Sequence, residues 1–250
     1  MPDIVHFRFY AELNDFLPTK KRNIKEHAYP LRGKNSVKDA IESFGIPHTE
    51  VDLILVNQKP VSFSYHLHPL DQVSVYPVFE SFDILGISHL RSKPLRHPAF
   101  VLDVHLGRLA RWLRTAGFDT LYRNDYRDDE IIDLSVAEKR IVLTRDIGIL
   151  KNSRVTHGYF VRQIYPGKQF GEIIQRFHLS REMISFSRCI HCNHPLVKVK
   201  KSSILNHLQP LTKKYYDEFM QCPRCGKIYW KGSHYQRMKK KLEMFADQTS

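Results

Sequence analysis

The 250-residue chain lacks any run of about 18 apolar residues, so the sequence predicts no membrane-spanning helix and no membrane partner. Its first residues contain neither a basic region nor a long apolar stretch, and we therefore expect no secretory signal and a cytoplasmic location. Neither Gly-x-Gly-x-x-Gly nor Gly-x-x-x-x-Gly-Lys occurs, which leaves nucleotide-binding functions without support. Hydrophobic residues still make up 42% of the chain, which excludes wholesale disorder and predicts folded domains.

Acidic residues are scarce in the later part of the chain. Lys and Arg number 39 in all, against 26 Asp and Glu. Residues 1–90 have a net charge of −2, residues 91–180 of +6 and residues 181–250 of +9. A polyanion is the expected partner of the basic part, and nucleic acid is the commonest one. The alternative is a basic surface that only keeps the protein soluble.

Cysteine is rare: the chain has four, all in its last quarter. They form two Cys-x-x-Cys pairs that are 29 residues apart, Cys189 with Cys192 and Cys222 with Cys225. In a cytoplasmic protein, two such pairs favour metal binding over disulfides. Each pair can form a turn that presents two thiolates, here called a knuckle, and two knuckles complete a closed tetrahedral site. We therefore expect these cysteines to bind a structural Zn²⁺ that takes no part in catalysis.

The first segment, about residues 1–85, has the pattern of a small α+β domain. Three stretches predict strands and one predicts a helix: residues 5–9, 51–56, 73–78 and, for the helix, 36–45. Ser36 can cap the start of this helix and Gly45 can end it. The Gly- and Pro-containing residues 86–98 predict a linker.

The second segment, about residues 99–180, alternates strands and helices. The predicted strands are residues 100–102, 120–122, 141–144 and 159–161, and the predicted helices are residues 106–116, 129–139 and 170–177. This alternation favours an α/β fold with a parallel sheet covered on both faces. The last segment, residues 181–250, contains the cysteines and ends in a basic, helical tail.

Acidic residues follow the predicted strands at the edge where open parallel sheets bind ligands. Asp103 directly follows one strand, Asp146 follows another, and Asp128 and Asp129 open the helix between these strands in the sequence. A group of carboxylates favours Mg²⁺ or Mn²⁺, and these ions can activate water for phosphodiester cleavage. The alternative is structural, because Asp is also a favoured N-cap and each acid could cap the following helix.

Basic residues near these acids could bind phosphate. Arg108, Arg111 and Arg114 lie opposite the apolar stripe of helix 106–116, and Arg145 directly precedes Asp146. A solvated arginine face is the alternative for the helix. Around the cysteines, Lys and Arg alternate with aromatic residues, which suits single-stranded nucleic acid, whose bases stack on such rings. Packing within the small ribbon is the alternative for these aromatic residues: Tyr215, Tyr216, Tyr229 and Trp230.

Several stretches resemble a known family. They are Asp103-Val104-His105-Leu106-Gly107-Arg108-Leu109-Ala110-Arg111-Trp112-Leu113-Arg114, Leu143-Thr144-Arg145-Asp146, Ser187-Arg188-Cys189-Ile190-His191-Cys192-Asn193, and the closing stretch from Cys222 to His234. Together they resemble the Mut-seven C-terminal RNase family, a PIN-like nuclease fold with a zinc ribbon, over about residues 99–240. Residues 1–85 are similar to the ubiquitin-like, sulfur-carrier-like β-grasp domain that precedes this nuclease in bacterial proteins.

The resemblance implies a metal-dependent ribonuclease. Asp103, Asp146 and either Asp129 or Asp128 match its acidic positions, while Lys231 and His234 of the closing stretch join the expected RNA-binding residues. The predicted fold is therefore a PIN-like α/β domain between an N-terminal β-grasp domain and a C-terminal zinc ribbon. Two alternatives remain: an RNA-binding module without catalysis, and an adaptor whose β-grasp domain binds a protein partner.

Overall fold

The computed structural model describes residues 3–77, 90 and 98–247. Contacts divide the chain into two compact units, residues 1–97 with 135–160 and residues 98–134 with 161–250. Apart from Leu90 and Pro98, the predicted linker lies outside the described residues. The domain boundaries expected from the sequence stay a prediction. In the described part of the chain, no helix is long and apolar enough to cross a membrane.

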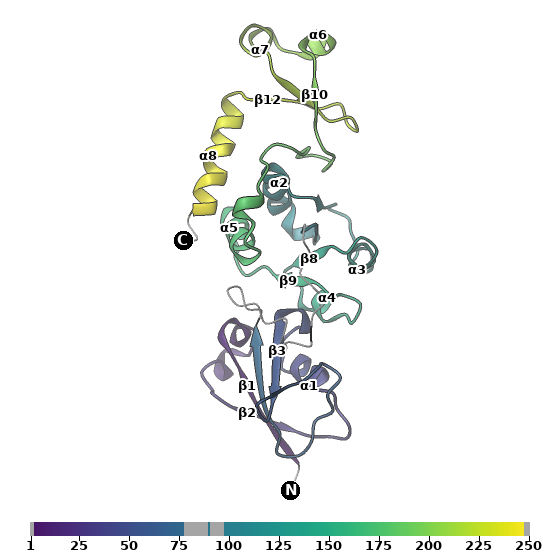
Figure 1. Cartoon of the computed structure of the whole chain (residues 1–250), viewed down its shortest axis with the longest axis vertical. Coiled ribbons are helices and arrows are strands. Elements are labelled where there is room, and N and C mark those ends of the chain that lie inside the picture. The colour runs from purple at the N-terminus through teal and green to yellow at the C-terminus, as the bar shows by residue number, and fades with distance from the viewer. Residues whose placement is uncertain (1–2, 78–89, 91–97, 248–250) are drawn as a thin grey trace. The chain divides into compact units, whose positions relative to one another are not determined.

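A five-stranded mixed sheet forms most of the first unit (Figure 1). Its strands are β1 (Ile4–Phe9), β2 (His27–Pro30), β3 (Val51–Val56), β4 (Lys59–Pro60) and β5 (Gln72–Pro77), in the order β2-β1-β5-β3-β4. β1 and β5 are parallel, and the other pairs are antiparallel. The predicted strands are confirmed, except that Val78, the last residue of the third, lies outside the described residues. Strand β2 and the short hairpin strand β4 were not expected.

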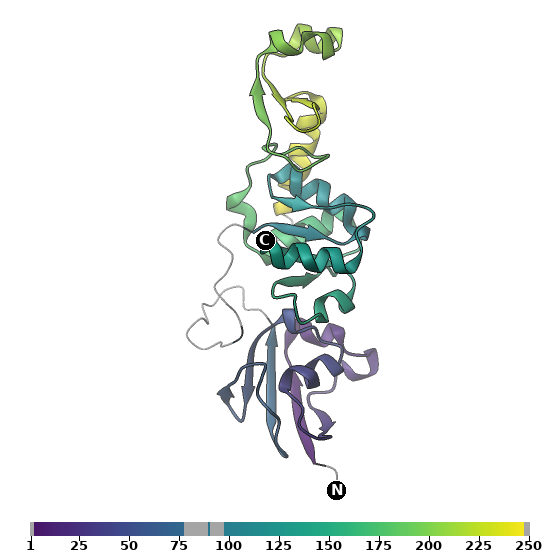
Figure 2. The ribbon, with the colours of Figure 1, turned by 90° about the vertical axis from the view of Figure 1, so that its right-hand side faces the viewer.

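Helix α1 (Val37–Ser43) packs on one face of this sheet (Figures 1 and 2). As expected, the Ser36 hydroxyl accepts a hydrogen bond from the backbone N–H of Asp39, and Gly45 has the left-handed φ that ends such a helix. The apolar face of α1 closes a core with Val5, Phe7 and Ile54, all fully buried. Three short 3-10 helices complete this part: η1 (Ala11–Phe16), η2 (Thr19–Lys21) and η3 (His48–Glu50).

Residues 135–160 belong to the same unit. They contain the whole strand–helix–strand segment of β8 (Ile141–Thr144), α4 (Ile147–Lys151) and β9 (Gly158–Phe160). β8 and β9 are parallel. The buried carboxylate of Glu50, at the end of η3, accepts a hydrogen bond of 2.6 Å from the backbone N–H of Phe160. Two regions that the sequence assigned to different domains therefore contact each other directly.

The second unit starts with β6 (Phe100–Leu102), η4 (Val104–Leu106), α2 (Gly107–Ala116) and β7 (Thr120–Leu121). β6 and β7 are parallel, and they belong with β8 and β9 to a four-stranded sheet in which every described pair is parallel. This confirms the predicted α/β class with a parallel sheet. The remaining helices before the cysteines are α3 (Asp128–Ala137), α5 (Pro166–Arg176) and η5 (Leu179–Glu182).

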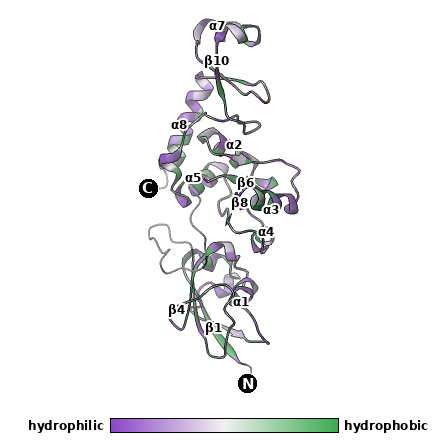
Figure 3. Ribbon diagram, turned by 45° about the vertical axis from the view of Figure 1, so that its right-hand side comes forward, coloured by the Kyte–Doolittle hydropathy of each residue, from purple (hydrophilic) through white to green (hydrophobic). Residues whose placement is uncertain are grey.

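The cysteine-containing segment is an antiparallel ribbon of β10 (Val197–Val199), β11 (Phe219–Gln221) and β12 (Ile228–Trp230). Its connection contains α6 (Lys201–Ile204), η6 (Leu205–His207) and α7 (Pro210–Tyr215). The predicted basic tail forms α8 (Ser233–Asp247), which is amphipathic (Figure 3). Near its end the Phe245 ring packs edge-on against Trp112 of α2 at 5.4 Å, so this helix returns to α2 and α5.

Candidate functional site

The four cysteines come together as expected. Their sulfur atoms all lie within 4.8 Å of one another, with 3.6 Å between Cys189 and Cys225 and 3.4 Å between Cys192 and Cys222. An ion that binds four thiolates tetrahedrally at about 2.3 Å holds the sulfurs about 3.8 Å apart. The arrangement is therefore compatible with a structural zinc ion. Among the described residues, this is the one group of three or more His, Cys, Asp or Glu side chains that could bind a metal.

The backbone explains why these pairs form knuckles. The Cys189 carbonyl accepts a hydrogen bond from the N–H of Asn193, and the Cys222 carbonyl accepts one from the N–H of Gly226, both at 2.9 Å. Asn193 and Gly226 have left-handed φ angles of 67° and 73°, which Asn and Gly tolerate best. Each knuckle thus ends in a residue suited to its turn.

The surroundings of the Cys189 thiol lower its pKa. Burial raises its pKa, but hydrogen bonds from the Tyr229 hydroxyl, 3.1 Å away, and from the N–H groups of Cys192 and His191 outweigh burial and bring the pKa to about 6. Because metals bind the thiolate, this environment favours metal binding at neutral pH.

Arg114 corrects one expectation. It is only 5% exposed, and its guanidinium donates hydrogen bonds to the carbonyl oxygens of Thr120 at 2.9 Å and His191 at 2.8 Å. Burial lowers its pKa, and the nearby thiols of Cys189 and Cys192 act in the opposite direction. The prediction that Arg114 faces solvent and phosphate is wrong, because the first knuckle covers this side of α2.

The other two arginines of α2 are exposed and line an open groove. The groove has a volume of about 430 Å³ and lies at the N-terminal end of the helix. Its lining residues are Val104, His105, Gly107, Arg108, Arg111, Tyr122, Ile164, Pro166 and Gln169. The Tyr122 hydroxyl donates to the Val104 carbonyl at 2.9 Å, and a Cβ at position 107 would lie 2.5 Å from that hydroxyl. Any larger residue at position 107 would therefore have to displace the Tyr122 ring, which lines the groove.

Asp103 lies next to this groove, immediately before Val104 and at the end of β6. It is 5% exposed, and its side chain forms no capping hydrogen bond to η4. Asp146 behaves differently, because its carboxylate accepts a hydrogen bond of 2.6 Å from the N–H of Gly148 and caps α4. Asp146 therefore acts as an N-cap, which was the structural alternative for these acids, whereas Asp103 does not. The neighbouring Arg145 is exposed.

Asp128 and Asp129 are exposed in the first turn of α3. The Asp129 carboxylate accepts a hydrogen bond of 2.9 Å from the guanidinium of Arg127. Nearby Asp125, which could supply a further acid, is held by Arg123, whose hydrogen bond lowers the pKa of Asp125. The catalytic roles of Asp103, Asp128, Asp129 and Asp146 stay a prediction.

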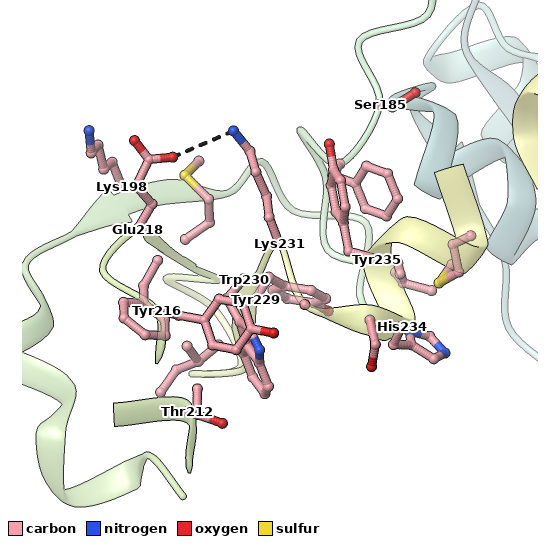
Figure 4. A pocket seen from close by; sticks show the side chains of 18 residues that line it. Ser185, Lys198, Thr212, Tyr216, Glu218, Tyr229, Trp230, Lys231, His234 and Tyr235 are labelled. Carbon is pink, nitrogen blue, oxygen red and sulfur yellow. Dashed lines mark hydrogen bonds and ion pairs between the residues drawn. The ribbon is translucent and has the colours of Figure 1, made fainter. Parts of the chain in front are cut away.

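Lys231 and His234 line a second, larger cavity of about 700 Å³ in the ribbon (Figure 4). Aromatic rings from distant parts of the sequence share its wall. Tyr216, Tyr229 and Trp230 were singled out by their alternation with basic residues, whereas Phe186 and Tyr235 were not. No short motif connects Phe186 to this wall, because the residue precedes the first knuckle.

Two family descriptions match the chain. The first, Mut7-C RNAse domain, matches residues 98–242, and the second, Mut7-C ubiquitin, matches residues 2–83. No curated protein and no solved structure matches the chain. The two matches confirm the resemblance that the motifs carry and the order of the two regions.

Proposed function

The chain belongs to the Mut7-C RNAse domain family, and on this basis we propose that it is a ribonuclease that requires a divalent metal ion for cleavage. RNA is the substrate that the family description implies. The observation that best supports the proposal is the groove beside Asp103. The buried Asp103 carboxylate lies at the end of a parallel strand, and the next residues of the chain line the groove. Two exposed arginines, Arg108 and Arg111, line the same groove.

Asp103 is the main proposed ligand of a catalytic Mg²⁺ or Mn²⁺, with Asp128, Asp129 and Asp146 as the further acids that the family resemblance assigns. Carboxylate oxygens suit these hard ions. When bound, such an ion supplies an activated water molecule for phosphodiester hydrolysis. Asp103 directly follows a parallel strand, at the edge where open sheets bind ligands, and this position supports the proposed role.

Zn²⁺ at the four cysteines has a structural role in this proposal. The donor set of four thiolates at these separations suits zinc, and a closed four-ligand site offers no position to a substrate. In the cytoplasm, which we propose as the compartment, the thiols stay reduced and available to the metal. The ribbon then positions Lys231 and His234 for RNA binding. Arg108, Arg111 and Arg145, which lie outside the ribbon, are the other proposed RNA-binding residues.

The test is cleavage of an end-labelled single-stranded RNA by the purified chain with Mn²⁺, with Mg²⁺ or with no added ion. We expect cleavage only with metal, and a loss of at least about 100-fold in Asp103→Asn. Glu26→Gln is the matched control, since that acid is paired with Arg8 in the ubiquitin-like region and should keep activity. RNA that is bound but never cleaved would favour a binding module, with the ubiquitin-like domain as a site for a protein partner.

A further inference from the structure

The 700 Å³ cavity in the ribbon, here called the ribbon pocket, has the size of a ligand site. It is bounded by the edge of β11 and β12, by α7, and by the first turns of α8 (Figure 4). The ribbon has two small hydrophobic clusters, one of Leu196 with buried cysteines and one of Ile204, Leu208 and Phe219, and Phe219 also lines the pocket. The pocket therefore lies directly against the core of the ribbon and shares Phe219 with it.

Aromatic rings and unused donors meet at its wall. Trp230 is 38% exposed, and its ring packs on that of Phe219, with 6.4 Å between ring centroids. Two further lining residues, Phe186 and Tyr235, contact each other with ring centroids 4.1 Å apart and ring planes tilted by 37°. Within the described residues, neither the indole N–H of Trp230 nor the hydroxyl of Tyr216 has a hydrogen-bond partner. A planar ligand with acceptor atoms would find both a stacking surface and donors here.

The charge around the pocket identifies the class of ligand. Lys198 and Lys231 line it, and His234 stands at the start of α8 (Figure 4). Of these, Lys231 pairs only loosely with Glu218, at 3.5 Å. Residues 181–250 contain 14 Lys and Arg against 5 Asp and Glu. An apolar peptide would gain little from such surroundings, whereas a base attached to a phosphate backbone uses both the rings and the cations.

We infer that the ribbon pocket binds an unpaired nucleobase of single-stranded RNA, with the base against Trp230 and its phosphates at Lys198 and Lys231. This inference rests on the proposed function and makes it more specific, because a paired base within a duplex cannot enter the pocket. The zinc ribbon thereby selects single-stranded substrate, while the groove on α2 contacts the backbone.

Trp230 reports on the pocket directly, since the chain has only one other tryptophan, Trp112. In Trp112→Phe, we expect indole fluorescence to be quenched by a single-stranded RNA of about 12 nucleotides. A blunt duplex of the same sequence and an abasic oligomer with the same backbone should not quench it. All titrations use the full chain with Asp103→Asn and without added divalent ion, so that binding is measured apart from cleavage.

Affinity gives the second readout. Trp230→Ala should weaken single-strand binding about 5- to 100-fold, and Trp230→Phe should restore most of it. Tyr215→Ala is the matched control, because Tyr215 is 64% exposed on the same ribbon but does not line the pocket. Equal losses in Trp230→Ala and Tyr215→Ala, or equal quenching by duplex and abasic oligomers, would overturn the inference. If single strands are bound as expected but no metal supports cleavage, the ribonuclease proposal is wrong, while the inference that the ribbon pocket binds a nucleobase is confirmed.

Discussion

The guanidinium of Arg114 donates a 2.8 Å hydrogen bond to the carbonyl oxygen of His191, which lies between the two cysteines of the first knuckle. Asn193 reinforces this link, because its side-chain carbonyl accepts from the N–H of Thr120 and its amide donates to Asp119 at 2.8 Å. Helix α2 and the zinc ribbon are thus joined through buried polar contacts, which are costly to break when one partner is lost.

Replacing Arg114 should cost stability and not RNA contacts. We expect Arg114→Ala to lower the free energy of unfolding by about 2–4 kcal/mol, because buried carbonyl groups lose their donor. Arg111→Ala, at an exposed position of the same helix, should change it by less than about 0.5 kcal/mol. Chemical denaturation measures both values. RNA affinity per folded molecule should fall in Arg111→Ala and stay unchanged in Arg114→Lys. A fall in Arg114→Lys with no change in Arg111→Ala would contradict the structural role of Arg114.

The case of Arg114 shows where sequence reasoning stops. Local features were predicted well: the Ser36 cap, the helix that ends at Gly117, and the cysteine pairs all depend on neighbouring residues. A helical wheel also separated an apolar from a polar face, but it treats the polar face as solvated. Arg114 lies on that face and is covered by a segment about 76 residues further along the chain.

The same limit applies to the ribbon pocket and to the acids. Phe186 reaches the pocket wall from outside the Cys-x-x-Cys spacing, and Gly107 is closely approached by the ring of Tyr122, fifteen residues later. For Asp103 and Asp146 the sequence left capping and metal binding equally open. Only the side-chain geometry separated the two residues, since one caps its helix and the other does not.

Loss of the metal site should unfold more than the ribbon. We expect Cys222→Ser to lose stoichiometric zinc and the hydrogen-exchange protection of β10 to β12, because zinc binding supplies folding free energy to such small segments. Through Arg114 and Asn193, the amides of β7 should also lose protection. Metal analysis and hydrogen exchange measure this, with Ser203→Ala, an exposed residue outside the knuckles, as the control. Full zinc occupancy in Cys222→Ser would contradict the assignment of this cysteine as a ligand.

The groove arginines should contribute to the salt dependence of RNA binding. A contact between one cation and one phosphate of a single strand adds about 0.7 to the slope of log affinity against log salt concentration. We expect Arg108→Ala and Arg111→Ala each to reduce the slope by about that amount. Arg123→Ala should leave it unchanged, because this guanidinium is paired with Asp125 at 2.8 Å. A slope that responds equally to all three variants would indicate a diffuse basic surface instead of a phosphate-binding groove.

His48 should determine how firmly the ubiquitin-like region holds residues 135–160. Its ring contacts the Glu42 carboxylate at 2.7 Å and the Val155 carbonyl oxygen at 2.9 Å, and the Lys151 ammonium donates to the Glu42 carbonyl nearby. His48→Ala leaves these polar groups without their partner in a buried position, so we expect a loss of about 2–3 kcal/mol in the free energy of unfolding.

His68→Ala is the matched control for this prediction, because the His68 side chain is 69% exposed and lies 3.9 Å from its nearest acid. It should change the free energy of unfolding by less than about 0.5 kcal/mol. Hydrogen exchange gives a local readout: the amides of β8 and β9 should lose protection in His48→Ala and keep it in His68→Ala. Since Glu50 and His48 both bind this segment, removal of the ubiquitin-like region should reduce the same protection even further. An adaptor domain that is independent of the nuclease region would instead leave these amides unchanged, and that result would return the ubiquitin-like region to the role of a separate protein-binding module.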